Sequence, residues 1–444
     1  MRRVLVIAGV WICAWGSVNL TAEEPTNVPN TVPATRPELK TALERLKDRQ
    51  PRIPVPAPSG ETGAGGYLPA TWGGGGGLGG FGQVDTRGAR DRRGRMLDAR
   101  LDRLFIDASL WVVSRSNNCQ YCLGHQELKL RAVGVDDDTI AALDTDWSRF
   151  DLPQQAVLAF ARKLTLQPEA VGEADIARLK AHFTDAEIIE LAFVVARFNA
   201  VNRWTEGLGL PQERHFRGDQ ETSFLTPTSA PFQSARSVVA PLGQGRLTSA
   251  TLSDVERGIA ANRNRTPRIT LPAEEAAREE LENVLGDREP YVWERALSHL
   301  PVNGRTHVLV WNTILTDDHL TLRLKAELCF ITARHNRAWY AAAHALHRLE
   351  ALGASPEDVA LLCEDSNGSA GGPVAAYRLA AKITTAPHLL TDGDIQRVRE
   401  SFSDAEAAQI LQVVCLANLF DRFTESLGLP VEGAIAGATA LLDH

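Results

Sequence analysis

Apolar residues recur at spacings of three and four from about residue 95 onward, which is the pattern of helices that bury one face. The first of these segments carries Leu101, Leu104, Phe105, Ala108, Trp111 and Val112. Further helices are predicted at about 118–133, 137–145, 153–166, 173–183 and 185–208. Because no segment alternates apolar and polar residues well enough to form a strand of a sheet, we expect an all-α fold.

Two parts of this helical region repeat each other. Residues 183–187 read Phe-Thr-Asp-Ala-Glu and residues 402–406 read Phe-Ser-Asp-Ala-Glu, and both are capping boxes that begin a helix. That helix ends in Leu-Gly-Leu-Pro at 208–211 and again at 427–430, so both pairs of segments lie 219 residues apart. We therefore predict two tandem copies of one helical domain.

The match extends back to His125, which corresponds to His344 at the same offset. Upstream of the histidine the offset drops to 218, because Asn118 is matched to Asn336. This alignment pairs Cys119 with Arg337, Cys122 with Tyr340 and Asp107 with Lys325. The second copy therefore keeps the histidine but has neither cysteine.

The ends of the two copies divide the chain into segments. We expect a signal peptide at 1–22, a linker at 23–94, the first copy at 95–213, a second linker at 214–289, the second copy at 290–432 and a C-terminal tail at 433–444. Within the linkers, short helices are expected near 38–48, 252–261 and 273–285.

The start of the chain has the pattern of an export signal. Arg2 and Arg3 precede an apolar run at 4–18, and Leu-Thr-Ala at 20–22 offers a cleavage site. The run is shorter than the ~20 residues of a membrane-spanning helix. We expect an exported protein, periplasmic or otherwise extracytoplasmic, with an uncleaved N-terminal membrane anchor as the alternative.

The first linker is rich in proline and then in glycine. Such a composition buries too little apolar surface to offset the entropy of the chain, so we expect a disordered tether. Five consecutive glycines at 73–77 are not followed by Gly-Lys-Ser/Thr. A phosphate-binding loop is therefore not favoured.

Composition and charge narrow the classes of function. The formal net charge of -8 provides no basic field, so a nucleic-acid partner is not expected. Of the six cysteines, Cys13 would leave with the signal peptide. The five that remain cannot all form disulfides within the chain, so the pattern is not that of a disulfide scaffold. Cys329 lies in an apolar helix and is expected to be a buried small hydrophobic residue. Only Cys119 and Cys122 are close in sequence.

Cys119, Cys122 and His125 are spaced three residues apart, so on a helix they share one face. This spacing brings the two sulfurs near disulfide range and places the imidazole beside Cys122. Asn117 or Asn118 would cap the helix and put both cysteines in its first turn, where the helix dipole favours a thiolate. We therefore favour an active dithiol.

Two other interpretations of the cysteine pair stay open. Export favours oxidation, so the pair would also suit a structural disulfide. A Cys-x-x-Cys pair is often half of a zinc site, but zinc needs four ligands and none is evident beyond Cys119, Cys122 and His125. We expect neither a metal nor a cofactor.

The cysteine segment carries a family resemblance. Residues 119–125 read Cys-Gln-Tyr-Cys-Leu-Gly-His, and Asn-Ala-Val-Asn-Arg at 199–203 precedes the Leu-Gly-Leu-Pro ending. Together they resemble the carboxymuconolactone decarboxylase and AhpD-type alkylhydroperoxidase family, in both copies. The resemblance implies an all-α domain that forms a homo-oligomer or, here, an intramolecular pseudo-dimer. It also implies reduction of a peroxide or disulfide, with an unidentified thiol reductant as partner.

The resemblance also assigns roles to residues. It makes Cys122 the attacking thiol, Cys119 the resolving thiol and His125 the proton-relay base. The family often has a glutamate twelve residues before the first cysteine, where this chain has Asp107, and its usual spacing from the second cysteine to the histidine is one residue longer.

Two alternatives to the dithiol enzyme are kept. One is a non-redox acid–base enzyme like the decarboxylase branch, in which Glu327 would pair with His344. The other is a helical scaffold without turnover. Arg203 and Arg422, each followed by an aromatic residue and Thr-Glu, occur in both copies and are expected to serve the fold, for example in a buried ion pair.

Overall fold

The computed structural model describes residues 29, 31–55, 98–214, 216–217, 220–221, 223–241, 249–317, 319–364, 372–433, 435 and 441–442. Within these ranges the chain is helical, apart from one antiparallel pair of two-residue strands, β1 (Phe216–Arg217) and β2 (Gln220–Glu221). The all-α prediction is confirmed. The predicted signal peptide and the glycine run lie outside the described residues. No helix in the described part of the chain is both long and apolar enough to cross a membrane.

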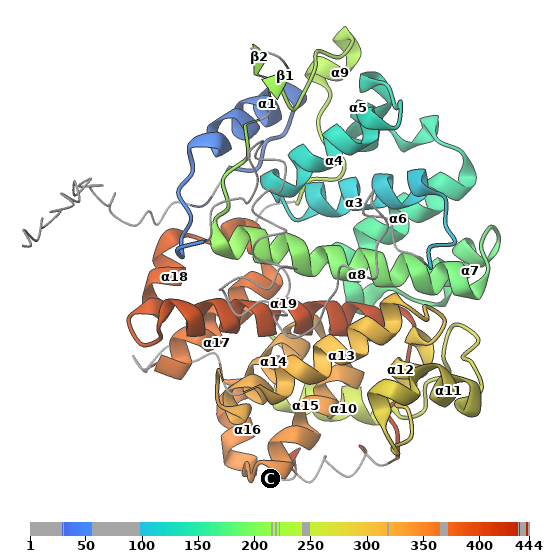
Figure 1. Cartoon of the computed structure of the whole chain (residues 1–444), viewed down its shortest axis with the longest axis vertical. Helices are drawn as coiled ribbons and strands as arrows, with labels where there is room; N and C mark the ends of the chain where they lie inside the picture. The colour runs from blue at the N-terminus through green and yellow to red at the C-terminus, as the bar shows by residue number, and fades with distance from the viewer. Residues whose placement is uncertain are drawn as a thin grey trace, which may run out of the picture.

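Two sets of helices follow each other along the chain (Figure 1). The first helix set comprises α3 (Arg103–Ser116), α4 (Gln120–Ala132), α5 (Asp137–Thr145), α6 (Leu152–Leu166), α7 (Glu173–Lys180) and α8 (Asp185–Leu208), with 3-10 turns at Trp147–Arg149 and Pro168–Ala170. The second helix set comprises α14 (Leu322–Asn336), α15 (Trp339–Ala351), α16 (Pro356–Cys363), α17 (Gly372–Thr385), α18 (Asp392–Arg399) and α19 (Asp404–Ser426), with a 3-10 turn at Pro387–Leu389.

The offset between the two sets is 219 residues along their whole length. Helices α14, α15, α16, α18 and α19 each begin 219 residues after α3, α4, α5, α7 and α8. The turn before α4 obeys the same rule, because Asn118 and Arg337 both adopt the left-handed conformation, with φ of 52° and 51°. The predicted drop of the offset to 218 is therefore wrong.

The corrected offset changes which residues correspond. Asn117, not Asn118, is the counterpart of Asn336, and the side-chain amides of both donate to the equivalent long helix, α8 or α19. The remaining counterparts are Ala338 for Cys119, Tyr340 for Tyr121, Ala341 for Cys122 and Ala326 for Asp107. The second helix set thus has alanine at both cysteine positions.

A segment at the N-terminal side belongs to the folded structure. Helix α1 (Arg36–Arg45), followed by a 3-10 turn at Leu46–Asp48, packs on α4 and buries Leu39 and Leu43 completely. The Arg36 guanidinium forms a buried ion pair with Glu127 of α4 at 2.9 Å. A helix near 38–48 was expected, but the prediction of a tether over all of 23–94 is wrong for residues 31–55. The apolar residues of α1, spaced four apart, bury one face against the first helix set.

The second predicted linker also folds. It contains α9 (Ala230–Ser234), α10 (Leu252–Asn262) and α11 (Glu274–Leu285), and α12 (Val292–Leu297) and α13 (Asn303–Thr316) follow before α14. The helices expected near 252–261 and 273–285 are confirmed as α10 and α11. Helix α10 packs on α15 as α1 packs on α4.

The segments after α1 and α10 attach to the two long helices in the same way. The backbone N–H of Arg52 donates to Leu208 at the end of α8, and that of Arg268 donates to Leu427 at the end of α19. Residues 49–53 read Arg-Gln-Pro-Arg-Ile and residues 265–269 read Arg-Thr-Pro-Arg-Ile, at an offset of 216. This second repeat was missed in the sequence, and it extends each repeated unit toward its N-terminal side.

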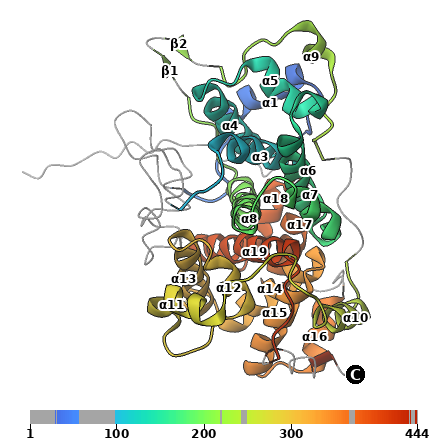
Figure 2. The same ribbon diagram turned by 90° about the vertical axis from the view of Figure 1, so that its right-hand side faces the viewer.

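Helices α8 and α19 lie side by side in the middle of the molecule, with α3–α6 on one side and α12–α15 on the other (Figure 2). Two buried arginines cross between the sets there. Arg203 Nη2 donates to the carbonyl of Thr384 at 3.1 Å, and Arg422 Nη2 donates to that of Thr165 at 3.2 Å. Both bonds run to backbone carbonyls of the other helix set, which agrees with the fold role expected for these arginines.

Candidate functional site

Cys119 and Cys122 lie at the start of α4, against α8. The turn that leads from α3 into α4 passes through Asn118, and Cys119 itself is the N-cap residue of α4. Its sulfur accepts the backbone N–H of Cys122 at 3.3 Å. The prediction that an asparagine caps this helix is therefore wrong by one or two residues. The prediction that both thiols sit at its N-terminal end agrees with this geometry.

One hydroxyl group joins the two thiols. The sulfurs of Cys119 and Cys122 lie 3.1 and 3.2 Å from Oγ1 of Thr205 in the last turns of α8. The Thr205 hydroxyl donates to the carbonyl of Asn202 at 3.1 Å, which leaves its oxygen free to accept S–H groups. Because both sulfurs approach one oxygen atom, they face the same small volume. The two thiols and Thr205 are called the dithiol cluster below.

The dithiol cluster is buried. Cys119 is 1% exposed and Cys122 is 2% exposed, and neither is in a disulfide. Burial raises the pKa of the Cys122 thiol well above its ordinary value, and the neighbouring Cys119 raises it further. A hydrogen bond that the Thr205 hydroxyl donates to the thiolate acts in the opposite direction. The thiolate expected at this helix end is therefore not favoured at Cys122, which must lose its proton before it can attack.

This pKa shift predicts the pH dependence of Cys122 reactivity. The thiolate is the form that reacts, and below a raised pKa its fraction grows about tenfold for each pH unit. We expect the rate of alkylation of Cys122 by iodoacetamide to rise by about tenfold between about pH 7 and pH 8. The measurement is mass spectrometry of the Cys122 peptide over time. A rate that stays constant between about pH 6 and pH 8 would reveal a lowered pKa and contradict this expectation.

His125 belongs to a second, more exposed cluster, also on α4. Its Nε2 lies 2.9 Å from Oε2 of Glu213 and 3.3 Å from the side-chain amide nitrogen of Gln212. The hydroxyl of Tyr121 donates to the other oxygen of Glu213 at 2.7 Å. Tyr121, His125 and Glu213 therefore form a carboxylate-centred cluster. The His125 side chain is 28% exposed, unlike the thiols.

Asp107 is not brought to the cysteines. Its Oδ2 accepts from Arg103 Nε at 3.0 Å, one turn away on α3. Helix α3 continues to Ser116 before the turn into α4, which separates Asp107 from that turn by about 13 Å along the helix axis. The structure therefore gives Asp107 an ion pair within its own helix, and the relay position expected for it is not formed.

The second helix set repeats the carboxylate-centred cluster without the thiols. Tyr340 donates to Glu432 Oε1 at 2.5 Å, and His344 Nε2 lies 3.1 Å from Glu432 Oε2. Although burial acts to raise it, the hydrogen bond and charge of His344 hold the pKa of Glu432 below its ordinary value. His344 also lines a cavity of about 30 Å³ with Tyr291 and Phe420. That volume is enough for about one water molecule.

Two expectations for the second helix set are resolved by the contacts. Glu327 is bound by Arg323 and Tyr377, so the predicted pairing of Glu327 with His344 is wrong and the partner of His344 is Glu432. Cys329 is 8% exposed, and burial raises its pKa to about 12, which agrees with a buried hydrophobic role.

Thr205 and Glu213 were not identified from the sequence. The signal available for Glu213 was the repeat itself, because Leu-Gly-Leu-Pro is followed by Gln-Glu at 212–213 and by Val-Glu at 431–432. Thr205 has the counterpart Thr424, whose hydroxyl bonds backbone carbonyls of α19, so the repeat alone could not mark it as a thiol contact.

Within the described ranges, no three His, Cys, Asp or Glu side chains converge as ligands for a metal ion. Neither a protein-family model nor a curated protein matches this sequence.

Proposed function

We propose that this protein is a thiol-dependent oxidoreductase that reduces a peroxide through Cys119 and Cys122. The observation that carries the proposal is the dithiol cluster, in which two reduced thiols on one helix turn share the hydroxyl of Thr205. The proposal agrees with the resemblance of the cysteine segment to the AhpD-type alkylhydroperoxidases.

The chain is proposed to be a tandem pair of such domains that forms an intramolecular pseudo-dimer. The constant offset of the helices, the repeated Tyr–Glu–His contacts and the reciprocal bonds of Arg203 and Arg422 support this organisation. In this arrangement the second helix set supplies the packing partner of α8, and dithiol chemistry is confined to one site in each chain.

The proposed reaction has two steps. The Cys122 thiolate attacks one oxygen of a hydroperoxide, so an S–O bond forms, the O–O bond breaks, and the leaving alkoxide takes a proton to become an alcohol. The Cys119 thiol then attacks the Cys122 sulfur, so the S–S bond forms and the S–O bond breaks, and the departing hydroxide takes the Cys119 proton to become water. An external dithiol returns the disulfide to two thiols.

The Tyr121–Glu213–His125 cluster is proposed to exchange these protons with solvent. His125 is bound to a carboxylate and is partly exposed, whereas the thiols are buried, so the imidazole is the group of this segment that can exchange a proton with water. A histidine held by a carboxylate is a suitable group for accepting and returning a proton near neutral pH.

The start of the chain leads us to propose that the mature protein acts outside the cytoplasm. Oxidising conditions there favour the disulfide form. Continued turnover then depends on a thiol reductant delivered to the same compartment.

The product of a single turnover tests the proposal. Treating the reduced protein with about one equivalent of cumene hydroperoxide should remove two thiols per chain and link the peptides that contain Cys119 and Cys122. Dithiothreitol should restore both thiols, as followed by thiol counting and peptide mapping. If all thiols survive, or if oxidation falls on Cys329, Cys363 or Cys415 instead, the proposal is wrong.

A second candidate is acid–base chemistry on a small carboxylated lactone at His344. It is favoured by one observation: His344, which is bound to Glu432, lines a cavity with Arg348, a cation suited to a carboxylate. That cavity has room for about one water molecule, so a lactone would have to enlarge it. Lactone turnover that survives complete thiol alkylation and is lost in His344→Ala would support it. Turnover unaffected by His344→Ala would exclude it.

A further inference from the structure

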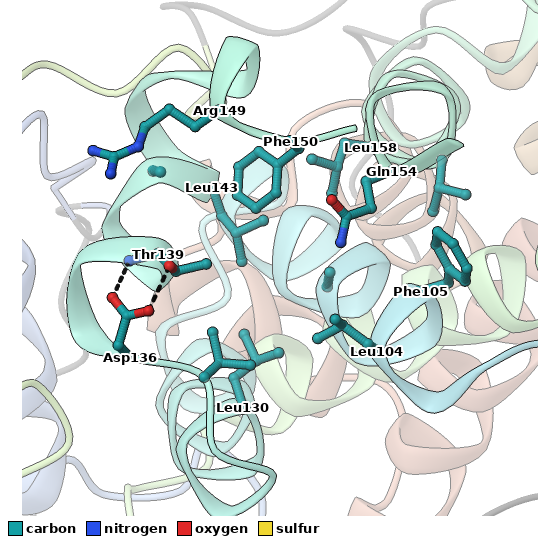
Figure 3. Close-up of a pocket in the computed structure, with 14 residues that line it drawn as sticks. Leu104, Phe105, Leu130, Asp136, Thr139, Leu143, Arg149, Phe150, Gln154 and Leu158 are labelled. Carbon is teal, nitrogen blue, oxygen red and sulfur yellow. Dashed lines mark hydrogen bonds between the residues drawn. The ribbon is translucent and has the colours of Figure 1, made fainter. Parts of the chain in front are cut away.

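The first helix set contains a cavity that is separate from the dithiol cluster. A cavity of about 370 Å³ lies among α3, α4, α5 and α6 (Figure 3). Its apolar lining includes Leu104, Phe105, Leu130, Leu143, Phe150 and Leu158. Neither cysteine nor His125 lines it. The volume lies within the range of small-molecule sites, and an apolar lining with few polar groups is typical of them.

The corresponding helices of the second helix set are joined by a polar cluster. Arg323 Nε donates to Glu327 at 2.7 Å, Arg323 Nη2 pairs with Asp358 at 3.0 Å, and Tyr377 donates to Glu327 at 2.5 Å. At the offset of 219, the counterparts of these four residues are Leu104, Ala108, Thr139 and Leu158, and all four line the cavity. Four positions that carry a charged and polar cluster in the second helix set therefore carry smaller or apolar residues at the cavity.

The polar groups at the cavity offer a hydrogen-bond donor. Gln154 Oε1 accepts the backbone N–H of Asp151 at 3.1 Å, which leaves the amide N–H₂ of Gln154 to face the cavity (Figure 3). The two oxygens of Asp136 accept from the backbone and hydroxyl of Thr139 at 2.8 and 2.7 Å. A ligand that bonds to Gln154 must therefore supply an acceptor. Asp136 and Arg149 give the lining one charge of each sign, so a charged ligand gains no net attraction and loses its hydration in the apolar cavity.

We propose that this cavity binds a neutral apolar molecule that carries a carbonyl or similar acceptor, of the size of a substituted benzene. The apolar lining buries the body of the molecule, and Phe105 and Phe150 provide ring contacts. The acceptor bonds the amide N–H₂ of Gln154. This binding is independent of the peroxide chemistry, since the residues of the two sites do not overlap.

The experiment compares three probes of similar shape by isothermal titration calorimetry on the full chain. Acetophenone has the ring and the acceptor, ethylbenzene lacks the acceptor, and benzoate adds a negative charge. We expect saturable binding of acetophenone, with ethylbenzene and benzoate each weaker by about tenfold or more. Gln154→Leu should reduce acetophenone binding to the level of ethylbenzene.

Two variants fill the cavity from different helices, so the test does not depend on the folding of one. Ala108→Phe on α3 and Ala142→Phe on α5 should each weaken acetophenone binding by at least about tenfold. Ala177→Phe makes the same change at an exposed position of α7 and should bind like the parent. Circular dichroism confirms folding of each variant. The proposal is overturned if the parent shows no saturable binding, if a folded cavity-filling variant binds as tightly as the parent, or if ethylbenzene binds as tightly as acetophenone.

Discussion

Cys122→Ser is expected to abolish peroxide reduction, because a serine hydroxyl at the same place is not ionised near neutral pH and cannot take the place of the thiolate. The rate of cumene hydroperoxide consumption with dithiothreitol as reductant should fall by at least about a hundredfold, to the rate of dithiothreitol alone. Serine is close in size to cysteine, so the buried packing beside Thr205 should be kept.

Two further cysteine variants make this prediction specific. In the absence of dithiothreitol, Cys119→Ser retains the attacking thiol and should consume about one equivalent of peroxide, ending as a sulfenic acid that a dimedone probe captures. Cys363→Ser changes a half-buried thiol in the second half of the chain and should leave the rate unchanged. If Cys122→Ser consumes peroxide as fast as the parent, Cys122 is not the attacking thiol and the assignment of roles fails.

Arg203→Leu is expected to cause the largest loss of stability among single substitutions at the contact of α8 with α19. Its guanidinium is buried and donates to Thr384 across the two halves and to Asn117 and Asn199 within the first. Leucine leaves several of these acceptors unsatisfied, at about 1–3 kcal/mol for each buried group. We expect the free energy of unfolding to fall by about 3 kcal/mol, measured by urea denaturation followed by circular dichroism.

The pseudo-symmetry of the chain provides a matched comparison for this substitution. Arg422→Leu removes the reciprocal donor to Thr165 and should destabilise by a similar amount. Arg257→Leu alters an arginine whose side chain is 71% exposed, so the change should stay within about 0.5 kcal/mol. Loss of less than about 1 kcal/mol in both Arg203→Leu and Arg422→Leu would show that these crossing bonds do not hold the halves together.

The helices and their repeat could be predicted from the sequence, because periodicity and capping boxes are local signals. The correct alignment of the two copies near the cysteines could not be predicted. Two adjacent asparagines, Asn117 and Asn118, compete for the match to Asn336, and asparagine is the residue favoured in the left-handed conformation. The structure gives that conformation to Arg337 in the second half, a choice that propensity does not predict.

The composition of the N-terminal region was a misleading guide at residues 31–55. Prolines at 37, 51 and 54 suggested a tether, yet Pro37 lies in the first turn of a short helix whose leucines pack on α4, and the other two follow that helix. The repeat of Arg-x-Pro-Arg-Ile at 49–53 and 265–269 was the available sign of structure, because both copies of this segment bond to the end of a long helix.

Only the part of the candidate site that lies within one short segment, the cysteine pair, could be predicted from the sequence. Cys119 and Cys122 lie together because a helix brings residues three apart to one face. Thr205 and Glu213 come from the end of α8 and the chain after it, more than eighty residues away, and they meet the cysteine segment only through tertiary packing. The same packing brings His125 to Glu213, and the spacing of residues along α4 could not predict that contact.

The reduction potential of the Cys119/Cys122 pair tests the central claim most directly. The measurement equilibrates the full chain with dithiothreitol or glutathione redox buffers and quantifies the linked Cys119–Cys122 peptide. If the pair is catalytic, we expect its reduction potential to lie above about -300 mV, within the range of thiol–disulfide oxidoreductases. A cellular reductant can then return the disulfide to two thiols. A potential far below about -300 mV would identify a structural disulfide and contradict the account.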